Sequence, residues 1–261
     1  LPDNPARADL SAARSPFVAR DTELARLAAA LSAARQGPGQ ICFIIGEAGS
    51  GKTSLIDEFT RQAMSVYGDV LVAGGACSAH SGPGEPYLPL CEIVQLLTGD
   101  IEAKRAGGAI LPELARRLWD SLPDTLQALA EHAPDLIGTF VRAETLALRA
   151  EVFSSSTSRW QARLTELAQR PAPANPPDLL AQFMALLHAL TRTRTLILVL
   201  DDLQWADEAT LNWLFYAGRH LIDQHCLIIG AYRPTDVALG RAGQRHPLEA
   251  VVNELQRHVG E

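Results

Sequence analysis

One glycine-rich segment, GEAGSGKTS at Gly46–Ser54, constrains the fold of this chain more than any other feature. It directly follows the apolar run Ile41–Ile45 and leads into Lys52–Ala63, where apolar residues recur at helical spacing. Glycines let such a loop curl until its amides point inward, and a helix N-terminus adds unpaired N–H groups and a positive dipole end. The spacing G-x-x-x-x-G-K-[ST] in this strand–loop–helix setting predicts a loop that binds phosphate groups.

The residues of this loop share the predicted contacts with a nucleotide. Lys52 supplies a full positive charge to the β- and γ-phosphates, and Thr53 offers its hydroxyl to Mg²⁺. The backbone amides supply the other donors. The predicted nucleotide-binding residues of the loop are therefore Gly46, Glu47, Ala48, Gly49, Ser50, Gly51, Lys52, Thr53 and Ser54.

A second segment, LILVLDDLQWAD at Leu196–Asp207, ends a strand-like apolar run with two acids. Carboxylates at the end of a buried strand are costly unless something positive lies beside them. Parallel sheets bind ligands at the carboxyl ends of their strands, so we expect this end beside the phosphate loop. Asp201 is then expected to hold Mg²⁺, and Asp202 to position or polarise the attacking water. Solvated acids at the start of a loop are the alternative.

Other polar residues near these segments have their own interpretations. Asp207 precedes a helical pattern and is expected to be its N-cap. Trp205 is expected to pack, and Gln204 is a weaker candidate to contact the attacking water. Arg233 follows the apolar run Cys226–Ile229, and its planar guanidinium suits a γ-phosphate. Spacing alone does not separate this role from that of an ordinary surface arginine.

Strand-like and helix-like segments alternate along the chain. Helices with one apolar face follow short runs that are apolar at every residue, which is typical of strands buried on both faces. This alternation predicts an α/β three-layer sandwich with a parallel sheet. The strand-like runs are Ile41–Ile45, Val70–Ala73, Leu196–Leu200 and Cys226–Ile229. The long connection before the third run reads as short helices, so we expect a helical insert at about 80–177 within a single core spanning 1–261.

Composition excludes several classes of protein. Hydrophobic residues make up 47% of the 261, too many for a disordered chain, and the formal net charge of -7 argues against a nucleic-acid-binding surface. No apolar run approaches the ~20 residues that cross a bilayer, so no membrane contact is expected. The four cysteines form no CxxC pair and the first residues do not read as a signal peptide, which points to the cytoplasm.

With these segments in order, the chain resembles the nucleotide-binding domain of STAND-type signal-transduction ATPases, a branch of the AAA-like P-loop proteins. Such domains occur in large LuxR-type and SARP-type transcriptional regulators and in ATPase-fused bacterial cyclases. The resemblance covers nearly the whole chain. It rests on FVARDTEL (17–24), GEAGSGKTS (46–54), GEPYLPL (84–90), LILVLDDLQWADEATL (196–211), GAYRP (230–234) and HPL (246–248).

The resemblance implies roles for individual residues. Phe17 and Val18 would lie against adenine, Asp201 and Asp202 would form the family's acidic pair, and Arg233 would sense the γ-phosphate. It also implies ATP as the nucleotide, with slow Mg²⁺-dependent hydrolysis that works as a switch in a signalling or transcription-regulatory protein. The expected catalytic residues are then Lys52, Asp202 and Arg233, and the expected metal ligands are Thr53 and Asp201.

The sequence departs from the family pattern at Ala19, where Gly is usual, at Gln204, where His is common, and at Ala231, where Thr is common. We also expect the core within 1–261 to be without the C-terminal lid that the resemblance implies. We therefore expect further domains of a longer chain, a strand at 41–45 without its outer neighbour, and nucleotide-dependent self-association. A nucleotide-sensing module without turnover is the alternative function. A small-molecule kinase and direct DNA binding are disfavoured, because neither an acceptor site nor a basic row is visible.

Overall fold

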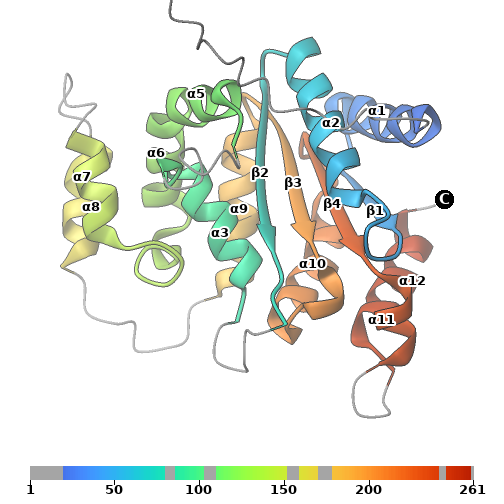
Figure 1. Cartoon of the computed structure of the whole chain (residues 1–261). Helices are drawn as coiled ribbons and strands as arrows, with labels where there is room; N and C mark the ends of the chain where they lie inside the picture. Colours follow the sequence, from blue (N-terminus) through green and yellow to red (C-terminus); the bar gives the residue numbers. More distant parts are fainter. Residues whose placement is uncertain are drawn as a thin grey trace, which may run out of the picture.

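A parallel sheet forms the centre of the domain (Figure 1). The computed structural model describes residues 20–79, 86–102, 110–151, 159–169, 178–240 and 245–259. Within these residues the sheet has four strands in the order β1-β4-β3-β2, and every pairing is parallel. The strands are β1 (Gln40–Ile45), β2 (Val70–Ala76), β3 (Thr195–Asp201) and β4 (Cys226–Tyr232). The predicted parallel α/β architecture is therefore confirmed, with β1 at one edge of the described sheet.

Two helix layers cover the sheet, so each strand alternates its side chains between two hydrophobic clusters. Helices α1 (Asp21–Gln36) and α2 (Lys52–Val66) cover one face, where they pack on Val72, Ile197 and Ile229. The opposite face, with Leu196 and Ile228, packs against a larger helical layer. That layer includes α3 (Leu88–Leu97), α9 (Leu179–Thr191), α10 (Glu208–His220) and α12 (Pro247–Val259).

Strand β2 is longer than the apolar run predicts. It continues through Gly74 and Gly75 to Ala76, which pairs with Asp201 of β3. A Cβ added to Gly75 would lie 2.2 Å from the backbone oxygen of Pro89. Glycine at this position therefore lets α3 lie directly against the end of the strand, and it brings β2 level with the carboxyl end of β3.

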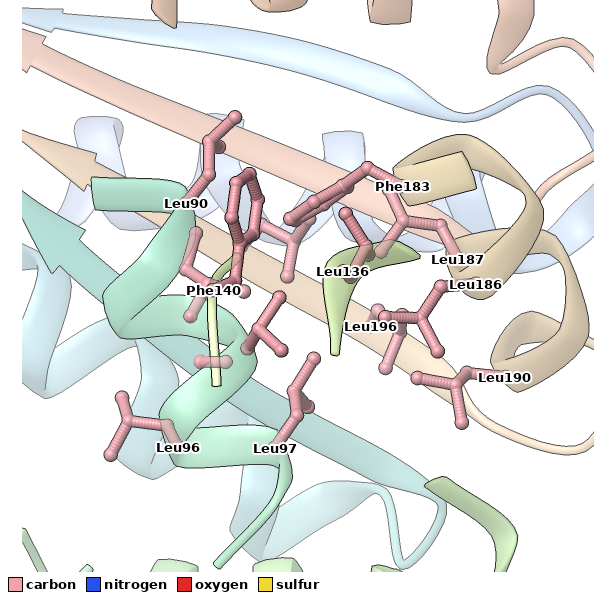
Figure 2. Close-up of a cluster of buried hydrophobic side chains, with 14 of the residues drawn as sticks. Leu90, Leu96, Leu97, Leu136, Phe140, Phe183, Leu186, Leu187, Leu190 and Leu196 are labelled. Atoms are coloured by element: carbon pink, nitrogen blue, oxygen red, sulfur yellow. The ribbon is translucent and has the colours of Figure 1, made fainter. Parts of the chain in front are cut away.

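Short helices fill the long connection between β2 and β3. They follow one another as α3, α5 (Pro112–Asp120), α6 (Leu122–His132), η1 (Pro134–Leu136), α7 (Ala143–Glu151), α8 (Arg159–Ala168) and α9. Figure 2 shows side chains of α3, η1 and α9 meeting Leu196 of β3 in one apolar cluster. The inserted helices thus share the core of the sheet. Within the described residues no helix is both long and apolar enough to cross a membrane.

One arginine of the insert is bonded to the end of α2. Arg117 of α5 is 11% exposed at its side chain. Its guanidinium donates to the backbone oxygens of Met64 at 2.7 Å, Tyr67 at 2.8 Å and Val70 at 3.0 Å. Carbonyls at a helix C-terminus lack helical partners, so a buried cation satisfies them well. The insert is therefore attached to the C-terminal end of the helix that follows the phosphate loop.

Replacing Arg117 with alanine should lower the free energy of unfolding by about 2–3 kcal/mol, because it leaves three carbonyls without their charged donor. Urea denaturation of the purified domain measures the change. Arg116→Ala is the matched control, since that neighbouring side chain is 62% exposed and forms ion pairs with Glu113 and Asp120 on the surface of the same helix. The Arg116→Ala substitution should lower the free energy of unfolding by less than about 1 kcal/mol. Equal losses in the two variants would contradict the assigned role of Arg117.

Candidate functional site

The loop between β1 and α2 curls because two of its glycines adopt positive φ. Gly49 has φ 73° and Gly51 has φ 78°, a region that other residues enter only with strain. Gly46 is also crowded, since a Cβ there would lie 2.5 Å from the Ser50 hydroxyl oxygen. Helix α2 begins at Lys52 with Gly51 as N-cap, and the described residues supply no side-chain cap. Its first N–H groups are thus left for another acceptor.

Lys52 is held tightly within this loop. It is 8% exposed, and its Nζ donates to the backbone oxygens of Gly46 at 2.8 Å and Glu47 at 3.1 Å. These contacts keep the ammonium group over the curled backbone, where its charge adds to the positive end of α2.

A cavity of about 340 Å³ opens beside the loop, and its size suits a small-molecule ligand. Its wall comes from the carboxyl ends of three parallel strands, which is where open α/β sheets bind ligands. The lining residues are Ala48, Gly49, Gly51, Lys52, Thr53, Ser54, Asp201, Asp202 and Arg233. The structure thus brings together residues that lie far apart in the sequence but were predicted for one site.

The first acid of the pair contacts the loop directly. Asp201 is the last residue of β3, and its Oδ2 accepts a hydrogen bond of 3.2 Å from the Thr53 hydroxyl. Its Oδ1 accepts from the backbone N–H of Asp202 at 2.8 Å. A threonine hydroxyl beside a carboxylate is a donor set that suits Mg²⁺, which prefers oxygen ligands.

Asp202 has an unusual backbone conformation. Its φ is 54°, in the left-handed region that few residues other than glycine adopt. Its Oδ1 accepts a hydrogen bond of 2.7 Å from Gln204 Nε2 and lies 3.7 Å from Arg233 Nη2. The side chain of Asp202 is 35% exposed, so the carboxylate remains open to the cavity. Observed strain of this kind is concentrated at functional sites.

Two buried polar atoms at the site have no hydrogen-bond partner within the described residues. They are the hydroxyl oxygen of Ser50, inside the loop, and Nε of Arg233, at the cavity wall. In the part of the chain that the structure describes, the Arg233 guanidinium has two long ion pairs, at 3.7 Å to Asp202 and 3.9 Å to Asp236. Leaving a buried donor unpaired costs about 1–3 kcal/mol. Arg233 lines the cavity, so a phosphate oxygen bound there would satisfy its guanidinium, and this residue fits a phosphorylated ligand.

The acids of the site also affect two neighbouring titratable groups. The pKa of the Cys77 thiol is raised to about 12, first by burial and then by nearby carboxylates. Those carboxylates belong to Asp207, Asp202, Asp201 and Glu92. Burial, and then the charge of Asp201, likewise raise the pKa of Asp57. Of the acids near the site, Asp201 and Asp202 line the cavity itself, opposite Lys52 and Arg233.

Some predicted residues do not line the cavity. Gly46 and Glu47 act through their carbonyls, which hold Lys52, and Ser50 lies behind the cavity wall. Phe17 and Val18, predicted to contact adenine, lie outside the described residues. Asp207 is the N-cap of α10, as predicted, with Oδ1 accepting from the N–H of Thr210 at 2.9 Å.

Sequence reasoning missed two residues that support the loop. The guanidinium of Arg20 donates to the backbone oxygen of Ser50. The hydroxyl of Thr235 donates to Glu47 Oε2 at 2.7 Å. Arg20 stands in the FVARDTEL segment and Thr235 follows GAYRP, so both lie next to quoted motifs, but no spacing rule predicts the contacts.

Comparison with known proteins agrees with this geometry. The family described as AAA ATPase domain matches residues 16–143 and 109–229, which together span 16–229. A search of curated proteins finds no match to this chain. Because the family match covers more than half of the 261 residues, the chain belongs to the AAA ATPase domain family.

Proposed function

We propose that this domain binds ATP with Mg²⁺ in the cavity beside Gly46–Gly51, hydrolyses it slowly, and works as a nucleotide switch. AAA ATPase domains as a family bind and hydrolyse ATP. The observation that carries the proposal for this chain is the 3.2 Å contact between the Thr53 hydroxyl and Asp201, made beside the ammonium group of Lys52. It joins a phosphate-binding loop to a carboxylate that suits a metal ion.

Binding is divided among groups with different chemistry. The loop amides and Lys52 hold the β- and γ-phosphates, and Thr53 with Asp201 holds the metal ion, directly or through water. Bound Mg²⁺ supplies neutralisation of the phosphate charge during phosphoryl transfer. The unpartnered Nε of Arg233, a residue of the cavity wall, supports binding of an anion at this position.

Hydrolysis needs positioning more than covalent chemistry. The Asp202 carboxylate, held by Gln204 at the cavity wall, accepts a hydrogen bond from the attacking water and orients it. Arg233 donates to the γ-phosphate with its planar guanidinium. Because these contacts exist only with a triphosphate, ATP and ADP states differ at the ends of β3 and β4, which is the basis of a switch.

The finer assignments rest on the resemblance. FVARDTEL and LILVLDDLQWADEATL support a STAND-type domain of a signalling or transcription-regulatory protein, with further domains as partners. The edge position of β1 supports nucleotide-dependent self-association. A cytoplasmic location is supported by the cysteines, all four of which lie in described residues and form no disulfide.

Lys52→Ala should weaken ATP binding by about tenfold to a hundredfold, because a charge-assisted contact with phosphate is lost. Isothermal titration calorimetry with ATP and GTP, with and without Mg²⁺, measures the change. Arg61→Ala is the matched control, since it removes a positive charge from the same helix where Arg61 pairs with Glu58. Its ATP affinity should equal that of the wild type. If the wild type binds neither nucleotide, the proposal is wrong.

Asp202→Asn should abolish phosphate release while ATP affinity stays within about threefold of wild type. The amide keeps the acceptor for Gln204, and asparagine tolerates left-handed φ, so the backbone should be preserved. A phosphate-release assay at saturating ATP and Mg²⁺ measures turnover. Asp223→Asn, an exposed acid before β4, should leave the rate unchanged. If the wild type binds ATP but releases no phosphate, the proposed hydrolysis is wrong, and the alternative of a nucleotide-sensing module without turnover holds.

A further inference from the structure

Gln204 connects the ends of two strands beneath the cavity. It is 1% exposed and lies in η2 (Leu203–Trp205), directly after the acid pair. Its Nε2 donates to Asp202 Oδ1 at 2.7 Å, and its Oε1 accepts from the backbone N–H of Arg233 at 3.1 Å. The side-chain amide of Gln204 thus fixes the carboxylate of Asp202 relative to the backbone of Arg233, directly after β4.

His246 binds the same glutamine from the other side. It is 2% exposed, and its Nε2 lies 2.9 Å from the backbone oxygen of Gln204. Its Nδ1 lies 3.2 Å from the backbone nitrogen of Leu248, which is a donor. Since Nδ1 must then accept, Nε2 carries the proton and donates to Gln204. The two ring nitrogens therefore make two different contacts.

The helix that follows His246 is firmly packed. Leu248, Val252 and Leu255 of α12 are buried in the cluster that includes α10. A Cβ added to Gly218 of α10 would lie 2.1 Å from Leu255 Cδ2, so the two helices approach closely. The imidazole is therefore hydrogen-bonded to the first turn of a helix that this packing holds in place.

We propose that His246 is a positioning residue for Asp202. It acts through Gln204, and so ties α12 to the acid that orients the attacking water. This inference rests on the proposed function, because positioning matters only if Asp202 takes part in turnover. A buried polar chain of this kind holds one geometry, since breaking any contact leaves a buried group unpaired. The competing explanation is that His246 only caps the start of α12 through Leu248.

Two substitutions separate these explanations, because each retains one nitrogen's contact. In His246→Asn the amide oxygen replaces Nδ1, which keeps the acceptor for Leu248 but loses the donor to Gln204. In His246→Gln the amide nitrogen reaches the position of Nε2, which keeps the donor to Gln204 but loses the contact with Leu248. The variants are therefore matched controls for each other.

Turnover at saturating ATP and Mg²⁺ gives the first test. His246→Asn should lower kcat by about tenfold to a hundredfold, the range seen when a supporting partner of a site residue is lost. Its dissociation constant for ATP, measured by calorimetry, should stay within about twofold, while His246→Gln should keep kcat within about threefold of wild type. A His246→Asn variant as active as wild type, or equal losses in both variants, would overturn the proposal.

Hydrogen exchange tests the link without turnover. In His246→Asn the amides of Trp205 and Ala206, which close the turn onto Asp202 and Leu203, should exchange faster than in wild type. In His246→Gln they should exchange as in wild type. Unchanged exchange in His246→Asn would overturn the inference, even if the wild type binds ATP without hydrolysing it. Loss of the proposed function is seen separately, in the nucleotide titrations of the wild type.

Discussion

The hydrogen bond between Thr53 and Asp201 joins two parts of the chain that are 148 residues apart, and the rest of the site is arranged around it. It forms because parallel strands place their carboxyl ends at one edge, so the loop after β1 and the acid ending β3 face each other across β4. Two carboxylates at this edge would be costly without positive charge. Lys52, the N-terminus of α2 and Arg233 supply that charge from the adjoining elements.

The loop itself is held from both sides by residues outside it. Arg20, just before α1, donates to the Ser50 carbonyl, and Thr235 of α11 (Pro234–Leu239) donates to the Glu47 carboxylate. These contacts fix the outer side of a loop whose other residues, among them Gly49, Gly51 and Lys52, line the cavity. A site built on rigid elements and supported from behind is preorganised for its ligand.

The loop, the four strands and the acid pair could be predicted from sequence, because their signals are local: a glycine spacing, short apolar runs and polar residues at strand ends. The start of α1 shows where local rules fail. Asp21 is of a residue type that favours the N-cap position, yet it is the first helical residue and Arg20 is the N-cap, without a side-chain cap bond. Arg20 instead reaches Ser50, a contact set by tertiary packing alone. The bonds of Thr235 and His246 are invisible in sequence for the same reason.

Both ends of α2 are hydrogen-bonded to distant parts of the chain, the first to strand β3 and the last to the insert. Its N-terminus carries Lys52 and Thr53, while its last carbonyls accept from Arg117 of the insert. A shift of α2 along its axis would therefore strain the phosphate loop and the insert together. The acid pair is linked to the rest of the domain in a similar way. Asp202 is hydrogen-bonded to Gln204, and Gln204 to His246, which lies just before α12. Two chains of contacts therefore lead away from the cavity, one along α2 to the insert and the other through Gln204 and His246 to α12.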